Sequence, residues 1–226
     1  MKVSKTTLKA LYKVFDGIRR VLRGDGTVWL NVGDVYTSGN RRYRSPDRKN
    51  RARAMCVRPP TPKGLKPKDL IGVPWRIAFA LQNAGWWLRS EVIWHKTNAH
   101  PESVRDRPTK AHETVFLLSK GQDYQYEPNA VLGSNGRRLR TVWDLQTEPL
   151  PRSSKWPDNH PAMMPLSLAY RCVAMTMQPG CVVLDPYAGS GTSLIAAHEL
   201  GCQWIGIEIK PSFVDLIEKR VLSFDA

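Results

Sequence analysis

The chain has 226 residues, with 34 lysines and arginines against 20 aspartates and glutamates, which gives a formal net charge of +14. This length suits one large domain, or a domain with an inserted arm, and is enough to bury a core. No apolar run approaches the roughly 18 residues of a membrane span, and there is no secretory leader pattern. We therefore expect a soluble, cytoplasmic protein.

The cysteines and histidines give no sign of a metal site. Cys56, Cys172, Cys181 and Cys202 show no Cys-x-x-Cys spacing, and the last three lie in apolar surroundings. They are expected to be reduced thiols in the core. The five histidines form no cluster of ligands either, so no metal is expected.

Apolar spacing predicts the first elements of the chain. A helix is expected to begin near Thr6 or Thr7, with its apolar stripe at Leu8, Leu11, Phe15, Ile18 and Leu22. After a turn at residues 24–26, residues 27–32 are apolar enough for a strand inside a parallel sheet. Asn31, Gly33 and Asp34 stand at the carboxyl end of this strand, where open α/β sheets bind ligands.

The positive charge is concentrated between Arg41 and Lys68, where eleven lysines and arginines face Asp47 alone. Residues 37–68 also contain five prolines and no periodicity, which indicates an exposed basic insertion. Such an arm favours a polyanion as partner, although a solvated or disordered loop without a partner is the competing interpretation. The residues of the arm expected to contact DNA are Arg41, Arg42, Arg44, Arg48, Lys49, Arg51 and Arg53.

The middle of the chain alternates between predicted elements and loops. A helix is predicted over residues 69–84, with its apolar face at Ile71, Trp75, Ala78, Phe79 and Gln82. Strands are predicted at 86–95 and 114–118, separated by a polar loop over 96–110. Residues 124–159 read as irregular and mix aromatic residues with arginines.

Two interpretations of residues 124–159 remain open. Tyr124, Tyr126, Trp143 and Trp156 stand near Arg137, Arg138 and Arg140, a combination that suits stacking on bases and pairing with phosphates. This favours a target-recognition region in which the three arginines contact DNA. Alternatively, the aromatic rings pin a long loop to the core.

The most informative stretch runs from Cys181 to Thr192. Apolar residues lead into Asp185, then Pro186, Tyr187 and two glycines, and a helix is predicted over 193–200. This is a strand, a tight turn and a helix. The glycines allow positive φ and a close approach of a ligand to amides that the helix leaves unpaired. A strand at 204–207 then delivers Glu208, an acid placed to accept hydrogen bonds from ribose hydroxyls.

The remaining helices frame this stretch. One is predicted from about Pro165 to Met177, and a final helix is predicted to begin at Pro211. The apolar stripe of the final helix is formed by Phe213, Leu216, Ile217, Arg220 and Val221. The whole pattern predicts an α/β protein.

Taken in chain order, these motifs resemble a known family, the S-adenosylmethionine-dependent DNA methyltransferases that methylate the amino group of adenine or cytosine. The resemblance is to their circularly permuted β class and covers nearly the whole chain apart from the insertion. The segments that carry it are Gly26 to Asp34, Trp94 to Asn98, Pro101 to Arg107, His112-Glu113, His160-Pro161, Asp185 to Thr192 and Gly206-Ile207-Glu208.

The resemblance implies a Rossmann-like methyltransferase sheet with helices on both faces, S-adenosylmethionine as cofactor and double-stranded DNA as partner. It assigns Glu208 to the ribose of the cofactor, and His160 and Pro161 to closing over it. The residues implied around the methionine part of the cofactor are Asp185, Tyr187, Gly189, Ser190, Gly191 and Thr192.

The catalytic loop of the family reads Asp or Ser, Pro, Pro and an aromatic residue, and it normally precedes the first predicted helix. No such loop is found, because Pro59-Pro60 is flanked by Arg58 and Thr61. The strand that carries the loop, and its neighbour, are also expected to be missing. We expect either a truncated remnant or a site completed by a second polypeptide or a homodimer, so no catalytic residue is assigned.

Three functions are weighed. The leading one is methyl transfer to a cytosine or adenine amino group, and the second is a silent module that binds DNA and cofactor. A dinucleotide oxidoreductase is the third, disfavoured because Leu194 stands where the third glycine of that fingerprint belongs.

Overall fold

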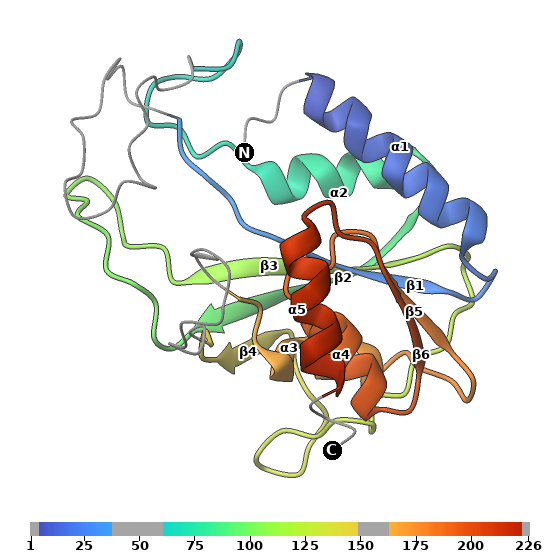
Figure 1. Cartoon of the computed structure of the whole chain (residues 1–226). Helices are drawn as coiled ribbons and strands as arrows, with labels where there is room; N and C mark the ends of the chain where they lie inside the picture. Colours follow the sequence, from blue (N-terminus) through green and yellow to red (C-terminus); the bar gives the residue numbers. More distant parts are fainter. Residues whose placement is uncertain (1–4, 38–60, 149–162, 223–226) are drawn as a thin grey trace. The chain divides into compact units, whose positions relative to one another are not determined.

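The computed structural model describes residues 5–37, 61–148 and 163–222 (Figure 1). It divides into two units, one formed by residues 1–21 with 32–86 and the other by residues 22–31 with 87–226. Within the described ranges, no helix combines the length and apolar character that crossing a bilayer requires.

In the first unit, helix α1 (Lys5–Val21) begins where the sequence predicts. Phe15 is buried and meets the ring of Trp86 edge-on, with the ring centres 6.0 Å apart. Arg19 lies over the same indole at 5.5 Å and donates to the carbonyl of Gly85 at 2.9 Å. These contacts anchor α1 to the chain that follows helix α2 (Val73–Asn83).

Helix α2 begins four residues later than predicted because the preceding turn is capped from elsewhere. Asp34 accepts hydrogen bonds from the backbone amides of Gly72 at 3.1 Å and Val73 at 2.9 Å. Gly72 takes the left-handed conformation, with φ at 73°, which suits glycine. Asp34 was expected near a ligand, and the structure gives it the role of a helix cap.

The predicted apolar face of α2 is confirmed for Ala78, and for Ile71 just before the helix, but is wrong for Trp75 and Phe79. Trp75 and Phe79 are 39% and 52% exposed, and their rings lie against each other at 5.3 Å. Apolar residues surround most of this helix, so periodicity alone does not select the buried side. The residues buried in the structure are Val73, Pro74, Ile77, Ala78 and Leu81.

The two ends of the predicted insertion are held side by side. Tyr36 and Leu70 form an antiparallel bridge, and the amide of Thr37 donates to the carbonyl of Asp69 at 2.9 Å. The hydroxyl of Thr37 also donates to the carbonyl of Lys66 at 2.7 Å. The described residues on either side of the insertion are therefore hydrogen-bonded to each other. The arm arginines and lysine from Arg41 to Arg53 lie outside the described residues.

The second unit contains a four-stranded sheet in the order β1 (Thr27–Val32), β3 (His112–Ser119), β2 (Trp87–Lys96), β4 (Val142–Leu145). Strands β2 and β3 are antiparallel, whereas β4 is parallel to β2. The expectation of a parallel sheet around residues 27–32 is corrected to a mixed sheet. β4 also corrects the irregular assignment of residues 124–159, of which 149–159 lie outside the described residues.

Helix α3 (Leu166–Ala174) shares an apolar core with this sheet. Trp143 of β4 is only 2% exposed, which supports the core interpretation for this one ring. The buried members of the core are Val92, Trp94, Val115, Trp143, Leu145, Leu168, Cys172 and Met175.

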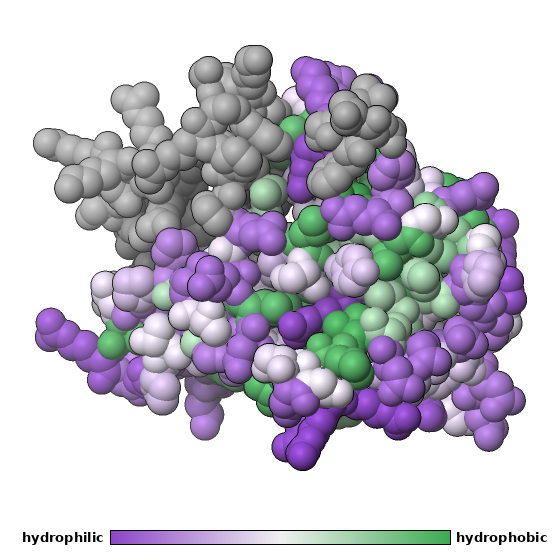
Figure 2. All heavy atoms as spheres, turned by 90° about the horizontal axis from the view of Figure 1, so that it is seen from below, coloured by the Kyte–Doolittle hydropathy of each residue, from purple (hydrophilic) through white to green (hydrophobic). Residues whose placement is uncertain are grey.

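Strands β5 (Val182–Asp185) and β6 (Gln203–Gly206) pair in parallel as a separate two-stranded sheet. Helices α4 (Thr192–Glu199) and α5 (Pro211–Leu222) lie beside it (Figure 1). The predictions for these elements are confirmed, including burial of Phe213, Leu216, Ile217 and Val221 along α5. Ile205 and Ile207 remain more than half exposed, and Figure 2 shows hydrophobic patches among hydrophilic side chains on the face that it views.

Cys181 and Cys202 form a disulfide, which corrects their assignment as reduced thiols. Each cysteine immediately precedes a strand. The pairing of Val182 with Gln203 places the Cα atoms of Cys181 and Cys202 5.3 Å apart. The sequence did not predict this disulfide, because the two cysteines are 21 residues apart and only the register of β5 against β6 brings them together. Cys172 is buried and free, and burial raises the pKa of its thiol.

Candidate functional site

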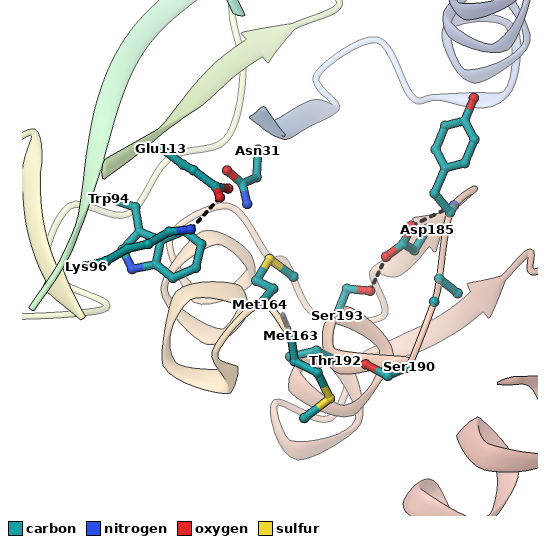
Figure 3. Close-up of a pocket in the computed structure, with 13 residues that line it drawn as sticks. Asn31, Trp94, Lys96, Glu113, Met163, Met164, Asp185, Ser190, Thr192 and Ser193 are labelled. Carbon is teal, nitrogen blue, oxygen red and sulfur yellow. Dashed lines mark hydrogen bonds and ion pairs between the residues drawn. The ribbon is translucent and has the colours of Figure 1, made fainter. Parts of the chain in front are cut away.

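A pocket of about 240 Å³ opens in the second unit between two polar walls (Figure 3). One wall is the loop between β5 and α4, and the other is formed by the ends of β1 and β2 with the start of β3. Met163 and Met164 lie between the walls. The lining residues are Asn31, Trp94, Lys96, Glu113, Met163, Met164, Asp185, Tyr187, Ala188, Gly189, Ser190, Thr192 and Ser193.

Asp185 organises the first wall from the carboxyl end of β5. Its Oδ1 accepts the amide of Tyr187 at 2.9 Å, and its Oδ2 accepts the hydroxyl of Ser193. The carboxylate is thereby fixed between the two ends of the loop. A carboxylate has about four acceptor positions, so these bonds leave capacity for a ligand.

The glycines of the loop have the positive φ that the sequence predicts, at 54° for Gly189 and 78° for Gly191. A Cβ at Gly191 would lie 2.8 Å from Cγ1 of Ile217, so the packing also excludes a side chain there. Their amides are already used, however. Gly189 donates to Glu208 at 2.9 Å and Gly191 to the carbonyl of Ala188 at 2.7 Å. The amides left for a ligand are those of the first turn of α4.

Glu208 stands behind the loop and does not line the pocket. Besides Gly189, it accepts the amide of Lys210 at 2.9 Å, so this acid fixes two backbone segments. Arg220 of α5 donates to the carbonyl of Ser190 at 2.5 Å, and burial lowers the pKa of its guanidinium. The loop is therefore supported by the carboxylate of Glu208 and by the guanidinium of Arg220.

The second wall is assembled by the antiparallel register of β2 and β3. Trp94 pairs with Glu113, so the end of β2 meets the start of β3. Lys96 forms an ion pair with Glu113 at 2.5 Å, and its Nζ lies 4.5 Å from the centre of the Trp94 ring. Trp94 is itself fixed by donating to the carbonyl of Leu145 at 3.1 Å.

The structure gathers most of the predicted cofactor residues, but not all. Asp185, Tyr187, Gly189, Ser190 and Thr192 line the pocket, whereas Gly191 and Glu208 support it from behind. His160 and Pro161 lie outside the described residues. Met163 and Met164 were missed, since no sequence pattern marks them.

The predicted DNA-contacting arginines of the 124–159 region are exposed. Arg138 donates to Asn129 at 3.1 Å, and Arg140 lines a second pocket with Tyr124, Tyr126 and other residues. Tyr124 carries the guanidinium of Arg89 over its ring at 5.2 Å. This arrangement leaves the stacking interpretation as a prediction for Tyr124 and Tyr126. Trp156 lies outside the description.

Residues 2–219 match a protein family described as DNA methylase (N6_N4_Mtase). The type II methyltransferase M.SmaI of Serratia marcescens is 50% identical over 221 residues, which cover 95% of this chain and 74% of that protein. M.Cfr9I of Citrobacter freundii is also 50% identical, over 96% of this chain and 72% of its own length.

Solved structures agree on the fold. The cytosine-N4-specific PvuII DNA methyltransferase superposes with a TM-score of 0.72 at 18% identity, over 94% of this chain and 70% of that one. A putative DNA modification methylase of Thermus thermophilus, complexed with S-adenosyl-L-methionine, gives 0.66 at 24% identity, over 97% and 78%. With the family match spanning nearly the whole chain, this protein belongs to the DNA methylases, the family of S-adenosylmethionine-dependent DNA methyltransferases.

Proposed function

We propose that the chain moves the methyl group of S-adenosylmethionine to the exocyclic amino group of a cytosine or adenine that is turned out of double-stranded DNA. The observation that carries this proposal is the pocket that joins the Asp185 loop to the wall formed by Trp94, Lys96 and Glu113. A methyl donor and a methyl acceptor must meet within one such space, because transfer requires the reacting atoms to be in contact.

The residues of the loop fit the cofactor. Its charged amino group and its hydroxyls need acceptors, which Asp185 offers inside the pocket, and its carboxylate needs donors, which the first amides of α4 offer. Ser190 and Thr192 add hydroxyls, whose oxygens lie 3.5 Å apart. At about 240 Å³ the described pocket is smaller than the roughly 300–1,000 Å³ of typical small-molecule sites, so it suits the part of the cofactor nearest the transferred methyl group.

When bound, S-adenosylmethionine supplies a methyl group activated by a sulfonium. The loop residues Asp185, Ser190 and Thr192 would hold it, and the methyl group it would supply would replace one proton of the amino group, which would pass to solvent. An exocyclic amino group is a weak nucleophile, since its lone pair is shared with the ring. Acceptors on the protein that bind its N–H groups raise its electron density and align it.

DNA binding is proposed for the basic arm and for the exposed arginines Arg137, Arg138 and Arg140. Lysine and arginine contacts to phosphates position a protein on the duplex without reading its sequence. Turning the target base out of the stack is required because a pocket cannot reach an amino nitrogen inside a duplex.

A second candidate is a module that binds DNA and cofactor without transfer, or that needs a partner chain. It is favoured by the pocket lining, since none of the described residues there belongs to an acceptor-Pro-Pro-aromatic loop. This candidate predicts salt-sensitive DNA binding and calorimetric cofactor binding, but no methylated base.

The deciding experiment incubates the chain with methyl-labelled S-adenosylmethionine and mixed-sequence duplex DNA. The DNA is then digested to nucleosides, and N4-methylcytosine and N6-methyladenine are measured by mass spectrometry. One of the two is expected. Cofactor and DNA binding without either product, in the chain alone and with its coding frame extended upstream, would favour the second candidate.

A further inference from the structure

The Oδ1 atom of Asn31 is buried and has no hydrogen-bond partner among the residues that the structure describes. Asn31 lies at the carboxyl end of β1, and its side chain lines the pocket together with the Asp185 loop. A buried carbonyl oxygen without a donor destabilises the folded protein, so its retention needs an explanation. A ligand that brings an N–H group into the pocket would supply the missing donor.

The surroundings of Asn31 define what kind of ligand fits. Figure 3 shows the side chains of Asn31, Glu113 and Lys96 converging on one side of the pocket. Lys96 and Glu113 neutralise each other at 2.5 Å, with side chains only 18% and 26% exposed. The wall therefore carries no net charge and selects neither an anion nor a cation. Trp94, which is only 2% exposed, lies under Lys96 and supports the same wall.

We propose that Asn31 is a catalytic and specificity-determining residue whose Oδ1 accepts a hydrogen bond from the exocyclic amino group of the flipped base. This inference rests on the proposed function and names the base-contacting residue within it. On the edge that faces the major groove in a duplex, cytosine and adenine present an amino N–H. Thymine and guanine present a carbonyl oxygen there, which would face the oxygen of Asn31. The same contact draws on the amino proton and orients the nitrogen toward the methyl donor.

The first test concerns the free protein. Asn31→Leu removes the unpartnered oxygen at similar volume, so urea unfolding is expected at an equal or higher midpoint than in the wild type. Asn83→Leu, at the exposed end of α2, is the matched control for the substitution itself. A clear drop in midpoint for Asn31→Leu alone would mean that Asn31 has a structural partner, and the inference would fail.

The second test measures methyl transfer to DNA in variants of Asn31. In Asn31→Leu, methyl transfer to DNA is expected to fall at least 100-fold while calorimetric affinity for S-adenosylmethionine changes less than twofold. Asn31→Asp, which keeps an acceptor oxygen, is expected to recover at least a tenth of wild-type transfer. Wild-type transfer rates in Asn31→Leu would overturn the inference and leave the proposed function standing.

A third readout does not need turnover. In protein saturated with S-adenosylmethionine, deoxycytidine or deoxyadenosine at millimolar concentration is expected to shift the side-chain amide resonance of Asn31, assigned by its absence in Asn31→Asp. Thymidine is expected to leave it unchanged. If wild-type protein binds cofactor but neither amino nucleoside moves this resonance, the inference is wrong. If the wild-type protein does not bind the cofactor, the proposed function is wrong.

Discussion

Leu194 of α4 packs directly onto the bare Cα of Gly206 in β6. A Cβ added at Gly206 would overlap Cδ1 of Leu194 and lie 3.3 Å from the Cβ of Ala188, and Leu194 is fully buried. Dinucleotide folds reach close helix–strand packing with a third glycine on the helix. In this protein the glycine is Gly206 on the strand, and the larger residue, Leu194, is on the helix. The close helix–strand contact is therefore kept without a third glycine on the helix.

The first prediction is that Gly206→Ala lowers the free energy of unfolding by about 1–3 kcal/mol, the usual cost of overpacking a buried site. Urea denaturation followed by circular dichroism measures this change. Gly17→Ala in α1 is the control, since a Cβ added there would meet no atom within 4 Å and alanine favours helices. Equal stability of wild type and Gly206→Ala would show that α4 moves away from β6 at little cost.

Much of the fold follows from the sequence where one signal dominates. The first helix with its buried Phe15, the strand at 27–32 and the start of α5 at Pro211 match the structure because periodicity or proline chemistry decides them locally. The prediction for α2 was wrong for Trp75 and Phe79 because apolar residues surround most of that helix. The Cys181–Cys202 disulfide, like strand β4, depends on which strands pair, and sequence spacing does not encode that choice.

The site also has one part that the sequence predicted and one part that it did not. The Asp185 loop is contiguous in sequence and was predicted as a unit, although the use of its glycine amides inside the protein was not. The opposite wall joins Asn31 to Glu113 and Lys96 across three strands. Only the order β1-β3-β2 brings these residues together, so their joint role required the structure.

The second prediction concerns the cap of α2. Asp34→Ala removes the acceptor for the amides of Gly72 and Val73 and is expected to destabilise the protein by about 0.5–2 kcal/mol. Asp34→Asn, which keeps one acceptor oxygen, is expected to lose less. Thermal unfolding is the measurement, with the exposed Asp16→Ala of α1 as control. If Asp34→Ala weakens cofactor binding at unchanged stability, Asp34 belongs to the ligand site after all.

The third prediction is a loss of stability at alkaline pH through Cys172. Burial raises the pKa of this thiol far above its ordinary value of 9.0, so the neutral form is favoured in the folded protein. Its contribution is fully present below pH 9.0. It declines above that pH by about 1.4 kcal/mol per pH unit, because the unfolded chain then releases the proton.

Urea denaturation between pH 8 and about pH 10.5 covers the range over which an unfolded thiol ionises. Cys172→Ala is expected to be less stable at neutral pH, through the lost packing, but to show a shallower alkaline decline. Comparing the two proteins cancels the titration of lysines and tyrosines that they share. Identical slopes above pH 9 would show that Cys172 ionises freely in the folded state.

The fourth prediction concerns Glu208, which supports the loop through the amides of Gly189 and Lys210. Glu208→Ala is expected to weaken the binding of S-adenosylmethionine by about 10-fold to 100-fold, since a charged acceptor contributes about 1.5–3 kcal/mol. Glu208→Gln is expected to fall in between. Isothermal calorimetry measures the affinity, and Glu218→Ala on the exposed side of α5 is the control. Unchanged affinity in Glu208→Ala would contradict both its supporting role and its assignment to the ribose.

The fifth prediction separates phosphate binding from base recognition. Arg137 and Arg140 are exposed, so each alanine substitution is expected to reduce the slope of log affinity against log salt concentration by about 0.9, for one lost phosphate contact. Fluorescence anisotropy with labelled duplex DNA at several salt concentrations measures that slope. Lys219→Ala on α5 removes the same charge from another exposed position and is expected to leave it unchanged. If all three variants lower the slope equally, the effect reflects net charge, and the region around Arg137 is no specific DNA contact.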